Sequence, residues 1–119
     1  VAPGLDIPRR ASLELLYHLL GVIPAYRDRI IPLLRSLCAG CLEEDLPAAT
    51  AGLTHPAPHV RAAALAALPA VPLLAEGLFP AGDDGTAALL WLARHDVASE
   101  ANAAAATALW EACGAELTR

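Results

Sequence analysis

The chain has 119 residues, of which 56% are hydrophobic and only 4% aromatic, and its formal net charge is −5. That length provides one hydrophobic core. The acidic balance argues against broad binding to the phosphate backbone of nucleic acids, which requires clustered positive charge. Prolines and charges interrupt every apolar run before the ~20 residues that a membrane span needs. We therefore expect a cytoplasmic protein that contacts neither nucleic acid nor membrane.

The basic residues and the cysteines are unusual in kind and in number. All eight basic residues are arginines, which fits paired guanidinium groups or a genome biased towards arginine codons. Three cysteines, an odd number without a signal-like N-terminus, favour reduced thiols over a disulfide framework. Because the chain begins with Val1 and ends just after an expected helix, we interpret it as a fragment of a longer protein.

Apolar residues recur at helical spacing from one end of the chain to the other. Alanine and leucine supply most of them, and both residues favour helix. The acidic run at residues 43–45 suits the first turn of a helix, where it complements the helix dipole. We expect helices over residues 6–23, 26–41, 46–53, 59–68, 71–78, 86–94 and 98–113, a flexible loop at 81–85, Asp96 as a cap of the last helix and Gly114 just beyond its end.

Two turn-plus-helix segments resemble each other at an offset of about 40 residues. Residues 55–61, followed by the helix 62–68, correspond to residues 95–100, followed by the helix 103–109. Residues 6–16 form a looser third copy. A period near ~40 residues with two helices per unit is typical of HEAT and armadillo repeats. The chain is therefore predicted to be an all-α solenoid of stacked antiparallel helix pairs, a single segment 1–119 with units near 1–41, 42–79 and 80–119.

A possible zinc site is the sharpest chemical alternative. Cys38 and Cys41 precede His55 and His59 at a spacing found in two-cysteine, two-histidine zinc sites. Prolines at 56 and 58 disfavour the helical turn that would bring the two histidines to one metal. The cysteines also fall on the apolar side of a helix, and as a redox pair they lack the helix N-terminus that lowers a thiol pKa. Our main expectation is therefore no metal and no cofactor.

No nucleophile, acid–base pair or phosphate-binding loop stands out, so we expect no enzyme and no catalytic residue. Arg10 and Arg61 occupy matching places early in their helices, where an arginine can bond turn carbonyls or an acid of the neighbouring repeat. The alternative for each is a solvated charge. Trp91 and Trp110 either fill the core of the last helix pair or form a partner-binding pair.

Residues 56–68, with Val60 and Arg61 followed by an alanine-rich run, resemble a HEAT repeat. The segments Ala-Leu-Leu-Trp-Leu-Ala-Arg-His-Asp-Val at 88–97, Glu-Ala-Asn at 100–102 and Ala-Leu-Trp-Glu-Ala-Cys-Gly at 108–114 are similar to part of the general control non-derepressible translational activator. This chain has Asn102 where that family has an arginine, which puts a continuous ladder of arginines in doubt.

The resemblance implies that the longer protein is a ribosome-associated scaffold that activates the initiation-factor-2 alpha kinase during amino-acid starvation. Its partners would then be proteins, with the ribosome and that kinase among them. The resemblance places no ribosome or kinase contact inside this piece, which has no basic patch for ribosomal RNA. A generic HEAT-type module for protein–protein interaction is the alternative.

Overall fold

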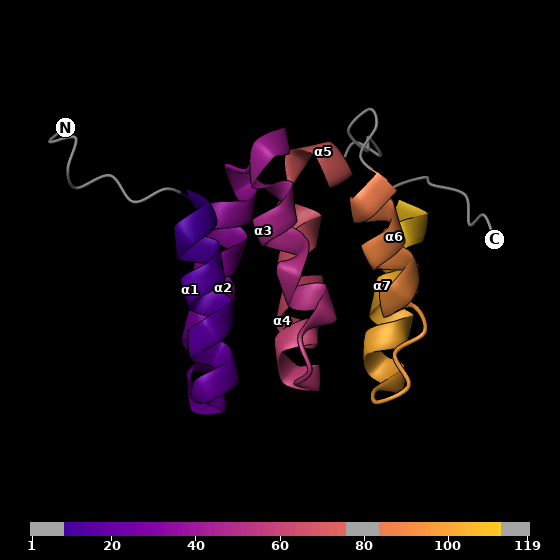
Figure 1. Cartoon of the computed structure of the whole chain (residues 1–119), viewed down its shortest axis with the longest axis horizontal. Helices are drawn as coiled ribbons and strands as arrows, with labels where there is room; N and C mark the ends of the chain where they lie inside the picture. Colours follow the sequence, from indigo (N-terminus) through magenta and orange to yellow (C-terminus); the bar gives the residue numbers. More distant parts are fainter. Residues whose placement is uncertain (1–8, 76–83, 113–119) are drawn as a thin grey trace, which may run out of the picture.

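A computed structural model describes residues 9–75 and 84–112 (Figure 1). Every regular element in these two ranges is a helix or a short 3-10 turn, so the predicted all-α class is confirmed for the described part of the chain. The longer helices are α1 (Arg9–Val22), α2 (Arg27–Ala39), α4 (Pro58–Ala67), α6 (Asp84–Ala93) and α7 (Glu100–Ala112). The short elements are η2 (Pro24–Tyr26), η3 (Glu43–Asp45), α3 (Leu46–Thr50), η4 (Ala51–Thr54), η5 (Leu68–Ala70) and α5 (Pro72–Ala75).

The helices form three antiparallel pairs placed side by side along the longest axis of the molecule (Figure 1). We call α1/α2 the first layer, α3/α4 the second and α6/α7 the third. The helices α1, α3 and α6 contact one another in sequence, as do α2, α4 and α7. The described chain therefore contains two rows of helices, within principal extents of 47 × 33 × 18 Å.

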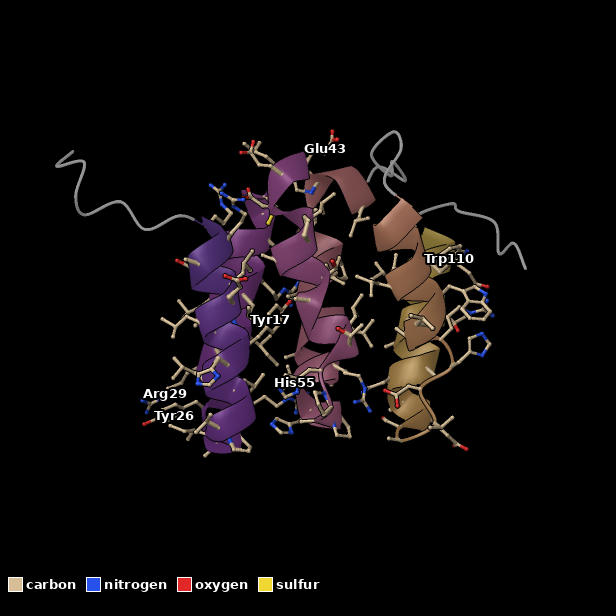
Figure 2. All side chains as sticks on the ribbon, in the orientation of Figure 1. Tyr17, Tyr26, Arg29, Glu43, His55 and Trp110 are labelled. Carbon is tan, nitrogen blue, oxygen red and sulfur yellow. The ribbon has the colours of Figure 1, made fainter. Side chains whose placement is uncertain are left out.

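The two ends of the layers differ in what they contain. The turns within each pair lie at the end where Figure 2 labels His55, and the connection between the first two pairs lies at the opposite end, near Glu43. We call these the turn end and the connection end.

The alanine-rich helix α4 lies at the centre of the array, in contact with α1, α2, η4 and α7. Pro58 begins it at a position where the missing N–H costs nothing. Its alanines Ala63, Ala64 and Ala67 are fully buried. Side chains this small let neighbouring backbones approach closely, so the helix gains its stability from being enclosed rather than from its own apolar area.

Tyr17 and Gly52 join the first layer to the second. The Tyr17 hydroxyl donates a 2.6 Å hydrogen bond to the Ala49 carbonyl, and burial raises the pKa of the phenol well above its usual value. A Cβ on Gly52 would lie 2.6 Å from Tyr17 Cε1 and 2.9 Å from the Ala64 Cβ. Only glycine leaves room for this approach, so Gly52 sets the spacing between α1, η4 and α4.

The third predicted helix is shorter than expected. In place of a helix over 46–53, α3 ends at Thr50 and is flanked by the 3-10 turns η3 and η4. The Thr50 hydroxyl donates to the Leu46 carbonyl at 2.8 Å, a local bond that competes with regular helix geometry. The tight contact at Gly52 falls within η4, where the helix was predicted to continue.

The bounds of the last helix pair also need correction. Helix α6 begins at Asp84, so residues 84 and 85 of the predicted loop are helical, while 81–83 lie outside the described residues. Helix α7 begins at Glu100 instead of residue 98. Ser99 is its cap, since its Oγ accepts the Asn102 N–H at 3.2 Å. The predicted cap, Asp96, has other partners. The expected ends at 6–8, 76–78 and 113–114 fall outside the described ranges.

None of the helices in residues 9–75 and 84–112 combines the length and the apolar character that crossing a membrane requires.

Candidate functional site

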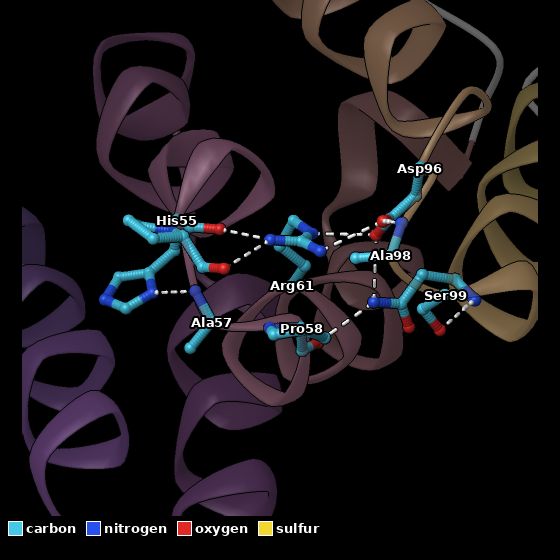
Figure 3. A network of polar contacts seen from close by, with 9 residues as sticks. His55, Ala57, Pro58, Arg61, Asp96, Ala98 and Ser99 are labelled. Atoms are coloured by element: carbon cyan, nitrogen blue, oxygen red, sulfur yellow. Dashed lines mark hydrogen bonds and ion pairs between the residues drawn. The ribbon is translucent and has the colours of Figure 1, made fainter.

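Arg61 is the centre of a polar network between the second and third layers at the turn end (Figure 3). Its Nη1 donates to the carbonyls of His55 at 2.7 Å and Pro56 at 2.9 Å. Its Nε and Nη2 donate to the two carboxylate oxygens of Asp96 at 2.7 and 2.9 Å. One guanidinium thus binds the turn that precedes its own helix and the turn of the next layer.

Asp96 is oriented by more than the arginine. Its Oδ1 also accepts the Ala98 N–H at 2.9 Å, and its Oδ2 accepts the Asn102 side-chain N–H at 3.2 Å. The Asp96 side chain is only 5% exposed and that of Arg61 14%. The Arg61 guanidinium, with these further donors, holds the pKa of Asp96 below its usual range. The pair is therefore a desolvated, bidentate ion pair.

Asn102 adds a second bond between the same two layers. It is 5% exposed, and its Nδ2 donates to the Pro58 carbonyl at 2.9 Å, across the boundary between α7 and α4. A short amide therefore reaches a turn carbonyl of the preceding layer. Asn102 stands where the resembled family has an arginine, and it makes an interlayer contact of its own.

Two histidines stand beside this network. The His55 Nδ1 accepts the Ala57 N–H at 3.0 Å, and the His59 Nε2 lies 2.9 Å from the Leu20 carbonyl of α1. Burial lowers the pKa of His55, and the positive charges that His59, Arg61 and His18 carry when protonated lower it further. The folded chain thus favours neutral His55, the form whose Nδ1 can accept the bond.

This lowered pKa predicts a loss of stability in acid. The unfolded chain binds a proton at His55 near pH ~6.5, where the folded chain does not yet bind one. The free energy of unfolding should therefore fall as pH drops below that value. His55→Asn keeps an acceptor for the Ala57 N–H but does not titrate, so urea unfolding at several pH values from 7.5 down should give a flatter profile for this variant.

The matched control for this prediction is His55→Ala, which removes both the titration and the acceptor. It should lower stability across the pH range while also flattening the profile. If His55→Asn retains the full acid-dependent loss of the parent chain, the loss does not come from His55.

Arg9 and Asp45 form an ion pair between the first and second layers at the connection end. Arg9 Nη1 lies 3.0 Å from Asp45 Oδ2, and the same oxygen accepts the Leu42 N–H at 3.0 Å. The Arg9 side chain is 36% exposed, so this ion pair is more exposed to solvent than the pair between Arg61 and Asp96. The Leu42 N–H and then Arg9 and Arg10 lower the pKa of Asp45, against an opposing effect of burial.

Arg10, singled out as the counterpart of Arg61, is exposed and lines a hollow of about 450 Å³ with Glu14 and Pro47. The sequence pattern put the interlayer arginine one residue too late: Arg9, not Arg10, makes the ion pair in the first layer. Because the two residues are adjacent, periodicity alone does not decide which of them faces the neighbouring acid.

The four residues of the zinc alternative are not brought together. Cys38 and Cys41 are buried at the end of α2, near the connection end, whereas His55 and His59 lie at the turn end with backbone partners of their own. Within residues 9–75 and 84–112, no three His, Cys, Asp or Glu side chains are close enough to hold a metal ion.

Trp91 and Trp110 differ in their surroundings. Trp110 is 5% exposed and belongs to the core, whereas Trp91 is only partly buried. The Trp91 ring stacks at a tilt on His95, with ring centroids 4.4 Å apart and an interplanar angle of 50°. The two tryptophans therefore do not share one environment.

The turn end also carries a shallow groove of about 400 Å³ between the second and third layers. Its apolar lining includes Leu92, which is 54% exposed, and Val97, which is fully exposed. Its polar lining includes His55 and His95. Arg61 and Asp96 also line the groove, and because they form an ion pair, they add no net charge to it.

Comparison with known proteins gives one informative match. Protein ILITYHIA of Arabidopsis thaliana is 35% identical to this chain over 102 residues, which is 86% of the chain but 4% of that protein. The chain thus spans only a small part of the relative it matches. No family model matches the chain, and no solved structure does.

These comparisons correct the family assignment made from the sequence. The HEAT repeat at residues 56–68 has no support from a family model. The matching relative is Protein ILITYHIA rather than a protein described as the general control non-derepressible translational activator. That assignment is therefore wrong as it was made, and what stands is an all-helical chain similar to a short stretch of a much longer protein.

Proposed function

We propose that this chain is a non-enzymatic scaffold segment, one stretch of a longer α-solenoid that binds other proteins. The observation that carries the proposal is the pair of helix rows, α1–α3–α6 and α2–α4–α7. In such an array each layer contacts only its neighbours, so layers can be added at either end without changing those already present. The similarity to 4% of a much longer protein supports the same reading.

The outer face of the first layer supports an extended array. Leu15 of α1 and Leu33 of α2 are 56% and 54% exposed, and together with Leu16 and Leu37 they line a hollow of about 290 Å³. The first layer is at one end of the described array (Figure 1), so no described helix pair covers this apolar face. Terminal layers of repeat proteins need a polar outer face, so a preceding helix pair of the longer protein is the cover we propose for it.

The test compares one substitution in two contexts. In the 119-residue chain Leu15→Glu should change the free energy of unfolding by no more than about 0.5 kcal/mol, since the side chain is already exposed. In the longer natural protein the same change should place a charge in a covered interface and increase proteolysis around α1. Leu42→Glu, at a side chain that is 58% exposed in the connection between layers, is the matched control.

Equal protease sensitivity of the two variants in the longer protein would show that nothing covers the first layer, and would remove the support for a continuous array. A destabilised Leu15→Glu variant in the 119-residue chain would point the same way.

For the longer protein we propose a scaffolding role in translation regulation during amino-acid starvation. Its support is the similarity of 86% of this chain to a short stretch of Protein ILITYHIA, a much longer protein. The test is co-sedimentation of the full-length protein with ribosomes from cells grown with and without amino acids. If the protein stays in the soluble fraction under both conditions, this role is excluded while the scaffold proposal still stands.

A further inference from the structure

Cys38 and Cys41 close the last turn of α2. The Cys41 N–H donates to the Cys38 carbonyl at 3.1 Å, and the Gly40 N–H donates to that of Leu37 at 3.1 Å. Cys38 has no exposed surface and Cys41 is 4% exposed. Residues 38–41 thus form a tight turn with a thiol at each end.

The turn brings the two cysteines within disulfide distance. A hydrogen bond between the first and fourth residues of a turn keeps their Cα atoms within about 7 Å. Disulfides bridge Cα atoms roughly 4.4–6.8 Å apart. The two side chains are also joined by a hydrogen bond in which the Cys38 thiol donates to the Cys41 sulfur. The turn therefore places the two cysteines close enough for a disulfide to form.

The surroundings distinguish the two sulfurs. The Arg9 guanidinium lies over the turn, since a Cβ on Gly40 would be 3.1 Å from Arg9 Nη2. The Cys38 hydrogen bond and, less strongly, Arg9 lower the pKa of Cys41, against the effects of burial and of Asp45. The same hydrogen bond and burial raise the pKa of Cys38. Negative charge is thus best accommodated on Cys41.

Access is also unequal. A hollow of about 400 Å³ at the connection end is lined by Gly40, Cys41, Leu42 and Pro72. Cys41 forms part of its wall, and Cys38 does not. The hollow therefore gives a small oxidant a route to Cys41, which keeps 4% of its surface exposed, and not to Cys38, which keeps none.

We propose that Cys38 and Cys41 are a peroxide-sensitive thiol pair, with Cys41 as the attacking and Cys38 as the resolving residue. The Cys41 thiolate attacks one oxygen of hydrogen peroxide and becomes a sulfenic acid, while the O–O bond breaks and the leaving hydroxide takes a proton to form water. The Cys38 sulfur then attacks the sulfenic sulfur. The S–S bond forms, and the sulfenic hydroxyl leaves with the Cys38 proton as a second water.

The experiment treats the folded chain with hydrogen peroxide in a Cys113→Ser background, which removes the third thiol. Trypsin then releases one peptide, Ser36–Arg61, that contains both cysteines. We expect this peptide to lose about 2 Da, to resist alkylation until a reductant is added, and to recover both thiols afterwards.

Single variants separate the two roles. With Cys38→Ala, the Cys41 sulfenic acid has no resolving partner and should be trapped by a cyclic 1,3-dione. With Cys41→Ser, Cys38 should react at least about tenfold more slowly. Circular dichroism identifies any variant that has lost its helices, and Cys38→Ser provides a second version of the first test.

Arg9→Gln gives a further check, because removing its charge should slow the oxidation of Cys41 without preventing the disulfide. The proposal is overturned if peroxide leaves both thiols free at doses that form sulfenic acid on an exposed model thiol. Equal trapping at Cys38 and Cys41 in the single variants overturns the assigned roles. None of these outcomes bears on the scaffold proposal, which does not depend on the thiols.

Discussion

Replacing Gly52 with alanine should lower the free energy of unfolding by about 2–3 kcal/mol, as overpacking of a tight core does. The added methyl would lie 2.6 Å from Tyr17 Cε1 and 2.9 Å from the Ala64 Cβ. Tyr17 is tied to the Ala49 carbonyl and Ala64 belongs to the central helix, so neither atom can move alone. Urea unfolding followed by circular dichroism measures the change.

Two further variants test whether the cause is this contact. At Gly40 an added Cβ would meet only the end of the flexible Arg9 side chain, so Gly40→Ala should cost much less. Tyr17→Leu removes the ring that an alanine at 52 would strike. Gly52→Ala should therefore lower the free energy of unfolding less in the Tyr17→Leu background than in the parent chain, with a coupling energy of about 0.5–3 kcal/mol. Strict additivity would mean that Gly52 matters through its backbone freedom and not through the interlayer contact.

Asp96→Ala should lower the free energy of unfolding by about 3–5 kcal/mol, as breaking a buried ion pair does. It leaves the guanidinium of Arg61 largely buried without its counter-ion, and it also removes the acceptor for Ala98 and Asn102. The loss should be seen at neutral pH. Because the pKa of Asp96 is lowered by folding, the pair's contribution is present above the unfolded value of ~3.9 and disappears as pH falls through the folded value.

The double variant Arg61→Met/Asp96→Asn is the control for this prediction. It removes both charges while keeping an acceptor for the Ala98 N–H, so no unpaired charge remains at the boundary. It should be less destabilised than Asp96→Ala, because breaking a buried pair costs more than replacing it. If the double variant is the less stable of the two, the attraction between the two charges stabilises the boundary, and the loss in Asp96→Ala does not come from leaving Arg61 unpaired.

The helices could be predicted because their signals are local. The apolar spacing of α1 and α2, and the alanine run of α4 after Pro58, each favour one periodicity over the others. The resemblance between residues 55–61 and residues 95–100 also placed Arg61 near the start of its helix and Asp96 in a turn, as the structure has them. What these patterns predict is which residues share a helix face.

The contacts between layers could not be predicted, because a shift of one residue along a helix changes which side chain faces the neighbouring layer. Arg9 and Arg10 are equally basic, and only the direction of α1 decides which one meets Asp45. Asp96 is a good cap by type, but Ser99 lies at the N-cap position and leaves Asp96 for Arg61. Serine is a preferred N-cap residue, so Ser99 was a usable signal that the more obvious aspartate obscured.

The two interlayer ion pairs described above lie at opposite ends of the layers. Arg9–Asp45 joins the first two layers at the connection end, and Arg61–Asp96 joins the last two at the turn end. Among the described residues, the ion pairs of the two boundaries therefore lie at opposite ends, and the contact between His59 Nε2 and the Leu20 carbonyl adds a polar bond at the turn end of the first boundary. Added salt weakens exposed charge pairs more than buried ones. Raising the ionic strength should therefore weaken the contact between the first two layers more than the contact between the last two.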